Sequence, residues 1–502
     1  MNSFKDSGCS AGDSLSAPAQ PKPATRREFM QAGIAAAGAA LTSSILPQAR
    51  AEAPAKKPNL IFIYTEGQRS DALSIAGNRI LKTPNQDRIG REGVVFKNAF
   101  CTNALCLPSR AVALTGMYSH STGAMGNFSS PEPLPADIPI VTDLLHEAGY
   151  EVAMCGKAHV GNGARERYWD YYFGFNAPVT NYYAPQFYEG QNGEMGEEAT
   201  YSGYADDLAT DRALTWLRKE RDKPFCLLLW QQAPHAPFFR RRPDLNLYNG
   251  IPIPVPATFD DDLRGYPGKS RAFADGKARI GTIDDHDAVR SLEELVKDYN
   301  AGLVAVDRNV GRIFNWLEQS SQLDDTAIIH SSDHGYFLGE WRTFDKRYMY
   351  EPSLRVPAML RYPRLFRSGT VIDEMVLNLD IAPTMLELAG VRIPERMQGY
   401  SFVGLARGEK TTWREDWLYE YDDHGVLGVP RHRGVRTDRY KLISYYHQTP
   451  PEFELYDLQS DPGEIRNVYG DPRYKDIQTR LWERMAQLRR ETGDLGYDYQ
   501  SR

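Results

Sequence analysis

The most informative stretch of this chain is residues 106–110, which read Cys-Leu-Pro-Ser-Arg, with a Thr-Gly pair at 115–116. Pro108 fits the first turn of a helix, and the alanine-rich residues after it can continue that helix. Cys106 is then expected at a helix N-terminus, where free N–H groups favour anions, with Arg110 on the same face. The segment predicts that a cysteine and a cation meet an anionic group. The alternative is an inert buried cysteine.

Three further segments carry side chains that suit an anionic ester. Residues 156–159 read Gly-Lys-Ala-His, and residues 344–347 read Phe-Asp-Lys-Arg. A single histidine, His235, lies in an Ala-Pro-His-Ala-Pro stretch directly after an apolar run. Taken alone, these segments are typical of a surface turn, a solvated charge run and a loop histidine. Their meaning therefore depends on whether the fold brings them to Cys106.

Short apolar runs alternate with helical patterns from residue 57 onward. Residues 59–64, 225–230 and 327–330 are candidates for buried strands, and residues 204–219 and 292–319 show helical periodicity. This alternation predicts an α/β fold with a large, mostly parallel sheet sandwiched by helices. The chemistry-bearing segments follow strands, where open α/β sheets place their sites.

The pattern changes beyond about residue 404. Residues 433–444 and 454–458 are strand-like, and residues 471–490 are amphipathic, with a capping Asp and a first-turn Pro. We therefore expect a catalytic α/β domain over 52–404. A smaller C-terminal subdomain over 405–502 should carry an antiparallel sheet and a closing helix.

The N-terminal region has the features of a targeting segment. Arg26 and Arg27 precede an alanine-rich run at 32–46, and Ala-Arg-Ala follows at 49–51. This pattern predicts a twin-arginine export signal over 1–51, and hence a periplasmic or secreted protein. The alternative is an amphipathic or disordered N-terminal arm. The apolar run is too short for a membrane span, so none is expected in the mature chain.

Composition and cysteine usage exclude some classes of protein. The chain has 502 residues, a net charge of −7 and an ordinary 25% of charged residues. The negative charge argues against a nucleic-acid partner. Of the five cysteines, Cys9 would be removed with the signal. Apart from Cys106, the mature chain would then keep only Cys101, Cys155 and Cys226, so a dense disulfide framework is excluded.

From about residue 59 to residue 469, these segments follow the order found in the type I sulfatases of the alkaline phosphatase superfamily, which the chain resembles. In that family the cysteine of the Cys-x-Pro-Ser-Arg signature, here Cys106, is converted to formylglycine, whose hydrated diol is the nucleophile. The resemblance implies a formylglycine-generating maturation enzyme as a partner. It also implies one calcium ion and hydrolysis of sulfate esters.

The resemblance extends to the residues that bind sulfate and move protons. It places Lys157, Lys346 and Arg110 as the cations preorganised around sulfur, where negative oxygens persist while the S–O bond breaks. His235 then faces the leaving oxygen and protonates it. His159 assists as a base when the second diol hydroxyl expels sulfate.

The resemblance also implies a metal site, with one departure from the family. An Asp-His-Gly element supplies a hard carboxylate oxygen and an accompanying histidine. Relatives carry Asp-Asp or Asp-Gln after the first strand, whereas this chain has Glu66 and Gly67, so Gln68 or a water is expected to fill the vacancy. Weaker metal binding is expected to follow. The implied ligands are Glu66, Cys106, Asp333 and His334.

Several segments look closer to one branch of the family. Residues 102–106, 344–351, 434–442 and 455–458 resemble N-acetylglucosamine-6-sulfatases and mucin-desulfating sulfatases. The 6-O-sulfate of N-acetylglucosamine or a related sugar in a sulfated glycan is therefore the expected substrate, although Trp341 replaces a histidine common in relatives. Two alternatives stay open. One is a formylglycine-dependent phosphonate monoester or phosphodiester hydrolase, and the other is a catalytically silent binder of sulfated glycans.

Overall fold

The computed structural model describes residues 56–127, 134–161, 165–261, 263, 269–276, 291–423 and 428–494. The export signal expected over 1–51 lies outside the described residues, as does Cys9. Lys56–Arg502 groups into one compact unit, and the domain boundary at 404 and 405 stays a prediction. Among the helices of the described ranges, none has both the length and the apolar character needed to cross a membrane.

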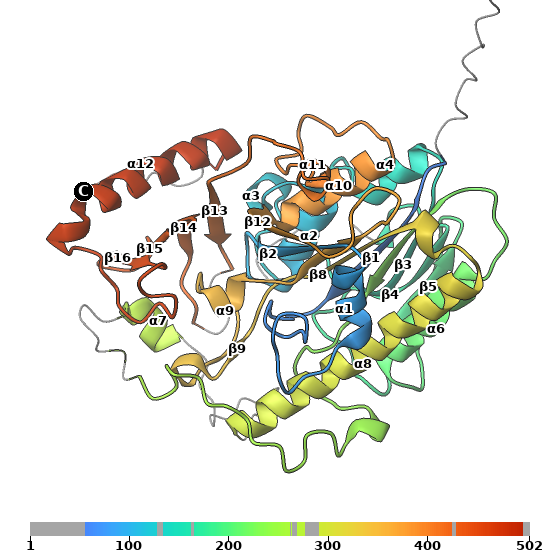
Figure 1. Cartoon of the computed structure of the whole chain (residues 1–502), viewed down its shortest axis with the longest axis horizontal. Coiled ribbons are helices and arrows are strands. Elements are labelled where there is room, and N and C mark those ends of the chain that lie inside the picture. Colours follow the sequence, from blue (N-terminus) through green and yellow to red (C-terminus); the bar gives the residue numbers. More distant parts are fainter. Residues whose placement is uncertain are drawn as a thin grey trace, which may run out of the picture. The chain divides into compact units, whose positions relative to one another are not determined.

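A ten-stranded sheet runs through the described part of the chain, in the order β12-β2-β11-β8-β1-β7-β3-β4-β5-β6 (Figure 1). The central strands β8, β1, β7, β3 and β4 are parallel, whereas β11, β5 and β6 pair antiparallel to their neighbours. The predicted α/β sandwich is confirmed. The strands are β1 (Asn59–Thr65), β2 (Val94–Phe100), β3 (Glu151–Lys157), β4 (Tyr171–Phe175), β5 (Gln186–Gln191), β6 (Glu194–Thr200), β7 (Phe225–Trp230), β8 (Thr326–Ser332), β11 (Ala358–Arg361) and β12 (Thr370–Leu377).

Helices cover both faces of this sheet, which is why its central strands are apolar throughout. In β1, Leu60 and Phe62 join the core under α2 (Cys106–Thr115), α4 (Val141–Glu147), α10 (Ile381–Leu388) and α11 (Val403–Ala406). Ile61 and Ile63 join the opposite core under α1 (Pro84–Arg91), α6 (Ala205–Leu217) and α8 (Leu292–Gln319). Because successive side chains of a strand point to opposite faces of the sheet, each strand contributes residues to two separate cores.

A second, four-stranded antiparallel sheet confirms the predicted C-terminal layer. Its strands are β13 (Asp416–Tyr421), β14 (His432–Thr437), β15 (Tyr440–Tyr445) and β16 (Glu452–Asp457). The strand-like piece expected at 433–444 is a hairpin, because the Thr437 hydroxyl accepts the backbone N–H of Tyr440 at 2.8 Å and turns the chain. The closing helix begins as a short 3₁₀ turn capped by Asp471 and continues as α12 (Lys475–Thr492).

Shorter elements connect these layers. They are α3 (Ser119–Thr122), α7 (Arg271–Gly276), α9 (Glu351–Leu354), β9 (Phe337–Leu338), β10 (Phe344–Asp345) and the 3₁₀ turns η1 (Arg242–Asp244), η2 (Leu323–Asp325), η3 (Glu340–Arg342), η4 (Asn378–Asp380) and η5 (Pro472–Tyr474). Strands β9 and β10 pair with each other, and the loop between them passes through η3.

Candidate active site

Cys106 is the first residue of α2, as the sequence predicts. Leu105 precedes it in an extended conformation, and the helix ends at Gly116 in the left-handed region. The Cys106 side chain is buried, and its Sγ lies 3.6 Å from Nε2 of His334. The helix N-terminus therefore presents Cys106 to residues that follow β8.

Arg110 lies one turn into α2 and is fully buried. Its Nε lies 3.1 Å from Asp333 Oδ2, its Nη2 donates to Glu66, and its Nη1 donates to the Lys157 carbonyl at 2.6 Å. The guanidinium also lies over the Trp230 ring at 5.2 Å. Arg110 therefore holds the two carboxylates in place, and all three of these polar contacts are to the protein itself.

Four potential metal ligands converge beside this arginine. The ligand atoms of Glu66, Cys106, Asp333 and His334 lie within 4.8 Å of one another, and all four side chains are buried. Glu66 Oε1 makes no hydrogen bond, although it faces Nε2 of His334 at 3.5 Å. A buried carboxylate oxygen without a donor is costly unless a cation or a ligand occupies the space before it. The donor set therefore fits a divalent cation.

The glycine at position 67, where the family resemblance leads us to expect Asp or Gln, has a structural basis. Gly67 has φ +76°, and a Cβ there would lie 3.3 Å from Cε1 of His334, so a side chain is disfavoured. Gln68 does not fill the vacancy, because its amide contacts the Thr65 hydroxyl at 3.0 Å and the Gln86 amide at 2.9 Å. Of the two substitutes expected for the missing ligand, Gln68 is therefore excluded.

The two lysines and the loop histidine meet at the same place. Lys157 Nζ lies 2.9 Å from Glu66 Oε2, and Lys346 Nζ lies 3.2 Å from His235 Nε2. His235 Nε2 is in turn 3.7 Å from Glu66 Oε1. Lys346 is only 5% exposed, which excludes the alternative of a solvated charge run. The structure thus brings together segments that are far apart in the sequence.

The electrostatic environment favours anions at Cys106. Burial and the Glu66 charge oppose ionisation of the thiol, but Lys346 and Lys157 outweigh them and hold the pKa of Cys106 well below its usual range. Burial lowers the pKa of His159 to about 4, so its imidazole is neutral at pH 7. Burial and Lys346 also lower the pKa of His235. The site is a preformed cluster of cations with two neutral imidazoles.

Glu66 and Asp333 respond differently to the same surroundings. Burial opposes ionisation of Glu66, but Lys157 and Arg110 outweigh it and hold its pKa well below the usual range. Burial and the Glu66 charge instead raise the pKa of Asp333 to about 7. A cation bound between the two carboxylates would favour their charged forms.

Arg347 belongs to this site and was missed by the sequence interpretation. It is buried, its Nε lies 3.0 Å from Asp345 Oδ2, and its Nη1 has no hydrogen-bond partner. Burial opposes the charged guanidinium, but the charges of Asp345, Tyr421 and Cys106 outweigh it and raise the pKa of Arg347. The only signal in the sequence is its position beside Lys346, which a solvated charge run would also explain.

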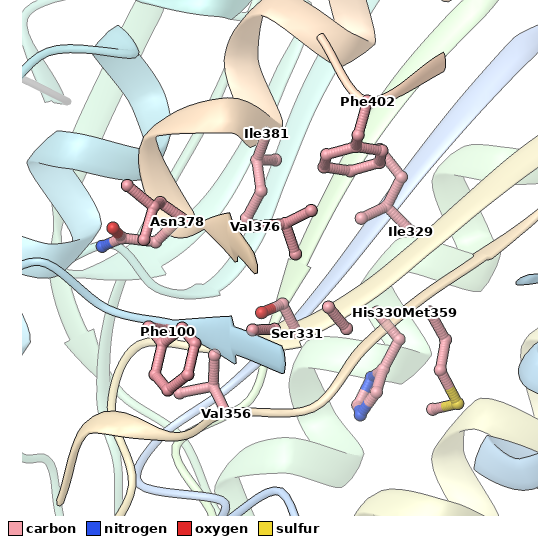
Figure 2. Close-up of a pocket in the computed structure, with 13 residues that line it drawn as sticks. Phe100, Ile329, His330, Ser331, Val356, Met359, Val376, Asn378, Ile381 and Phe402 are labelled. Carbon is pink, nitrogen blue, oxygen red and sulfur yellow. The ribbon is translucent and has the colours of Figure 1, made fainter. Parts of the chain in front are cut away.

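A small cavity lies in the core away from this pocket (Figure 2). Its lining is mostly apolar and includes Phe100, Ile329, Val376, Ile381 and Phe402. None of the four potential metal ligands lines it. The cavity is therefore a gap between the sheet and α10, and the chemistry lies elsewhere.

Family comparisons agree with this site. Residues 58–391 match the family model described as Sulfatase, and residues 339–491 match the one described as N-sulphoglucosamine sulphohydrolase, C-terminal. An N-acetylglucosamine-6-O-sulfatase of Bacteroides thetaiotaomicron is 33% identical over 88% of this chain and 87% of its own. The chain belongs to the sulfatase family. It is a hydrolase of sulfuric esters, as the motifs predicted.

Solved structures give the same result for the fold. One described as a complex with its substrate D-glucosamine-2-N,6-O-disulfate has a TM-score of 0.81 and 31% identity, and the match covers 89% of this chain and all of that one. A phosphonate monoester hydrolase from Silicibacter pomeroyi has a TM-score of 0.73 at 21% identity, covering 87% of this chain and 96% of its own. The second likeness shows the fold alone.

Proposed function

We propose that this sulfatase removes the 6-O-sulfate of N-acetylglucosamine or a related sugar in a sulfated glycan. The observation that carries the proposal is the convergence of Lys157, Lys346, His235 and His159 on Cys106, in a buried pocket with unsatisfied polar atoms. The choice of sugar is supported by the relative that acts on N-acetylglucosamine 6-O-sulfate and by the structure described with a 6-O-sulfated glucosamine.

Two groups complete the proposed site. Cys106 is converted to formylglycine by a maturation enzyme, and the hydrated aldehyde supplies the nucleophilic oxygen in the place of Sγ. Glu66, Asp333 and His334 hold one divalent cation, for which Ca²⁺ is the proposed metal because two of these ligands offer hard oxygens. The cation acidifies and orients the nucleophile when it is bound.

The chain's own residues then position the ester. Lys157 and Lys346 both lower the pKa of Cys106, so both cations act at the position of the nucleophile. There they bind the anionic oxygens of the sulfate. These contacts strengthen as negative charge gathers in the transition state. Their removal should therefore lower turnover more than substrate affinity.

His235 and His159 divide the proton transfers. His235 Nε2 lies beside the Lys346 ammonium at 3.2 Å and donates a proton to the departing sugar oxygen. Its lowered pKa rises when the anionic ester enters the pocket, because a nearby negative charge favours the imidazolium. His159 is neutral at pH 7 and accepts a proton at Nδ1, which is buried without a hydrogen-bond partner.

The proposed cellular setting follows from the N-terminal sequence. The twin-arginine pattern within 1–51 directs the folded protein to the periplasm or the outside of the cell. Conversion of Cys106 before export is compatible with that route, since twin-arginine export moves folded proteins. Export of the matured enzyme would bring it to sulfated glycans outside the cytoplasm.

The proposal is tested by sulfate release from protein produced together with a maturation enzyme. N-acetylglucosamine 6-O-sulfate should be desulfated faster than its 3-O-sulfated isomer, with Cys106→Ala as the blank. Aryl sulfate and aryl phosphonate esters with the same leaving group separate sulfatase from phosphonate hydrolase activity. Faster cleavage of the phosphonate, or retention of the glycan without sulfate release, would contradict the proposal.

A further inference from the structure

The loop that carries Lys346 has a strained backbone. Trp341, Arg342, Asp345 and Arg347 all have positive φ, at 50°, 54°, 84° and 92°. Residues other than glycine rarely adopt this region, and bulky ones such as Trp do so only where their surroundings impose it. Some contact outside the loop must therefore hold it in the conformation that places Lys346 beside His235.

One such contact comes from a buried lysine that is enclosed by aromatic rings. Lys269 Nζ lies 4.0 Å from the ring centroid of Tyr350, 4.1 Å from that of Trp341, 4.7 Å from that of Tyr456 and 5.4 Å from that of Phe273. Lys269 is only 8% exposed. An ammonium over the faces of desolvated aromatic rings is attracted by their quadrupoles. We call these four rings the Lys269 cage.

Hydrogen bonds fix the ammonium within the Lys269 cage. Lys269 Nζ donates to the Glu464 carbonyl at 2.7 Å and to the Tyr456 hydroxyl at 3.1 Å. The Glu454 carboxylate then joins the walls, accepting from the Tyr350 hydroxyl at 2.5 Å and from the Ser270 backbone N–H at 2.7 Å. The cage thus ties α7 and β16 to the loop after β9.

Two walls of the cage, Trp341 and Tyr350, bracket Lys346 in the sequence. Their rings lie 5.3 Å apart, so the cage holds both ends of the loop together while Lys346 extends toward His235. Trp341 is also the residue that stands in place of the histidine expected from the family resemblance. The departure therefore has a local explanation, because an indole offers a better face to a cation than an imidazole does.

We propose that Lys269 is a positioning residue for Lys346, acting through the Trp341 and Tyr350 walls of the cage. Lys269 touches neither the ester nor the nucleophile. It supplies the cation that keeps the strained loop in its productive conformation. The inference rests on the proposed role of Lys346 in binding sulfate.

The test compares Lys269→Met with Arg221→Met. Methionine keeps an unbranched side chain one atom shorter than that of lysine and removes the charged ammonium. Arg221 is a matched control, because its guanidinium lies 4.4 Å from the ring centroid of Trp216 at the opposite end of β3 from the site. Steady-state turnover of an aryl sulfate and hydrogen exchange of peptides spanning 337–350 are the two measurements.

For Lys269→Met we expect kcat to fall about 10- to 100-fold with KM changed much less, and faster exchange in 337–350. Arg221→Met should lower the melting temperature but leave kcat and that exchange unchanged. Unchanged kcat or unchanged exchange in Lys269→Met overturns the proposal. If the wild-type protein releases no sulfate from any ester, the proposed function fails. The role of Lys269 in holding the loop is then decided by whether hydrogen exchange in 337–350 is faster in Lys269→Met than in the wild type.

Discussion

Two buried clusters of charge in this sulfatase differ in how completely they are satisfied. Around Cys106, the charged and polar groups leave Glu66 Oε1 and His159 Nδ1 without hydrogen-bond partners. Behind the Lys346 loop, Lys441 lies 2.8 Å from Glu351 and 2.6 Å from Glu464.

In this second cluster, within the described residues, the charged atoms of Glu351, Glu464, Lys441 and Arg436 are all satisfied. We call the first cluster open, because it has buried polar atoms that a ligand could satisfy, and the second closed, because its charged atoms already have partners. The comparison predicts that changes in the open cluster cost activity and that changes in the closed cluster cost stability.

The largest effect is expected for Cys106→Ala. The variant removes the nucleophile, so sulfate release should fall at least about 10⁴-fold while the melting temperature stays close to that of the wild type. Colorimetric sulfate detection and differential scanning calorimetry measure the two quantities. Cys226→Ala, in the core strand β7, is the control and should keep its turnover.

The next prediction compares one lysine from each cluster. Lys346→Met should reduce kcat about 10²- to 10³-fold, because it removes a cation from the transition state. Lys441→Met should instead lower the free energy of unfolding by about 3–5 kcal/mol, since it leaves Glu464 and Glu351 buried beside fewer positive charges. Urea unfolding and steady-state kinetics of both variants give the answer. If both variants lost kcat and unfolding free energy to the same extent, the distinction between the two clusters would be wrong.

Metal binding should stabilise the open cluster alone. At a Ca²⁺ concentration about 100 times the dissociation constant, folding gains about 2.7 kcal/mol, and the melting temperature should rise accordingly. Chelation should reverse this rise. Glu66→Gln should have a lower melting temperature and show a much smaller calcium-dependent increase. An equal increase in both proteins would show that Glu66 is not a ligand.

The smallest effect concerns a closed pair, His120 and Glu420, whose Nδ1 and Oε2 lie 2.7 Å apart. Burial opposes the charged imidazole, but Glu420 outweighs it and raises the pKa of His120 to about 9. The pair therefore contributes its full stability below about pH 6.5 and loses it as the pH rises through 9. Relative to His120→Gln, wild-type stability should fall by about 1–3 kcal/mol between pH 6 and pH 9.5 in calorimetry.

The sequence predicted the main layers of the fold, because they follow from local patterns. The apolar run at 225–230 and the periodicity at 292–319 coincide with β7 and α8. Residues 433–444 were predicted only as strand-like, whereas they form most of a hairpin. The turn was not predicted, because a turn stabilised by a threonine hydroxyl leaves little trace in the hydrophobic pattern. The antiparallel pairing of β11 inside the sheet, and of β5 and β6 toward one edge, also depends on contacts that no local pattern encodes.

The motifs named the residues that the structure brings together around Cys106, but not the contacts that these residues make. Arg110 was expected to meet the anionic ester, whereas its guanidinium is committed to Glu66, Asp333 and the Lys157 carbonyl. Gln68 was expected as a substitute ligand, but its amide bonds to neighbouring polar groups. These contacts join residues more than 40 positions apart or depend on side-chain rotation, so spacing alone does not determine them.

The most direct test of the account is the mass of the proteolytic peptide that contains Cys106, from protein produced together with a maturation enzyme. The account predicts the mass of an aldehyde in place of the thiol, and sulfate release in proportion to the converted fraction. An unmodified thiol in a preparation that still releases sulfate would contradict the formylglycine mechanism.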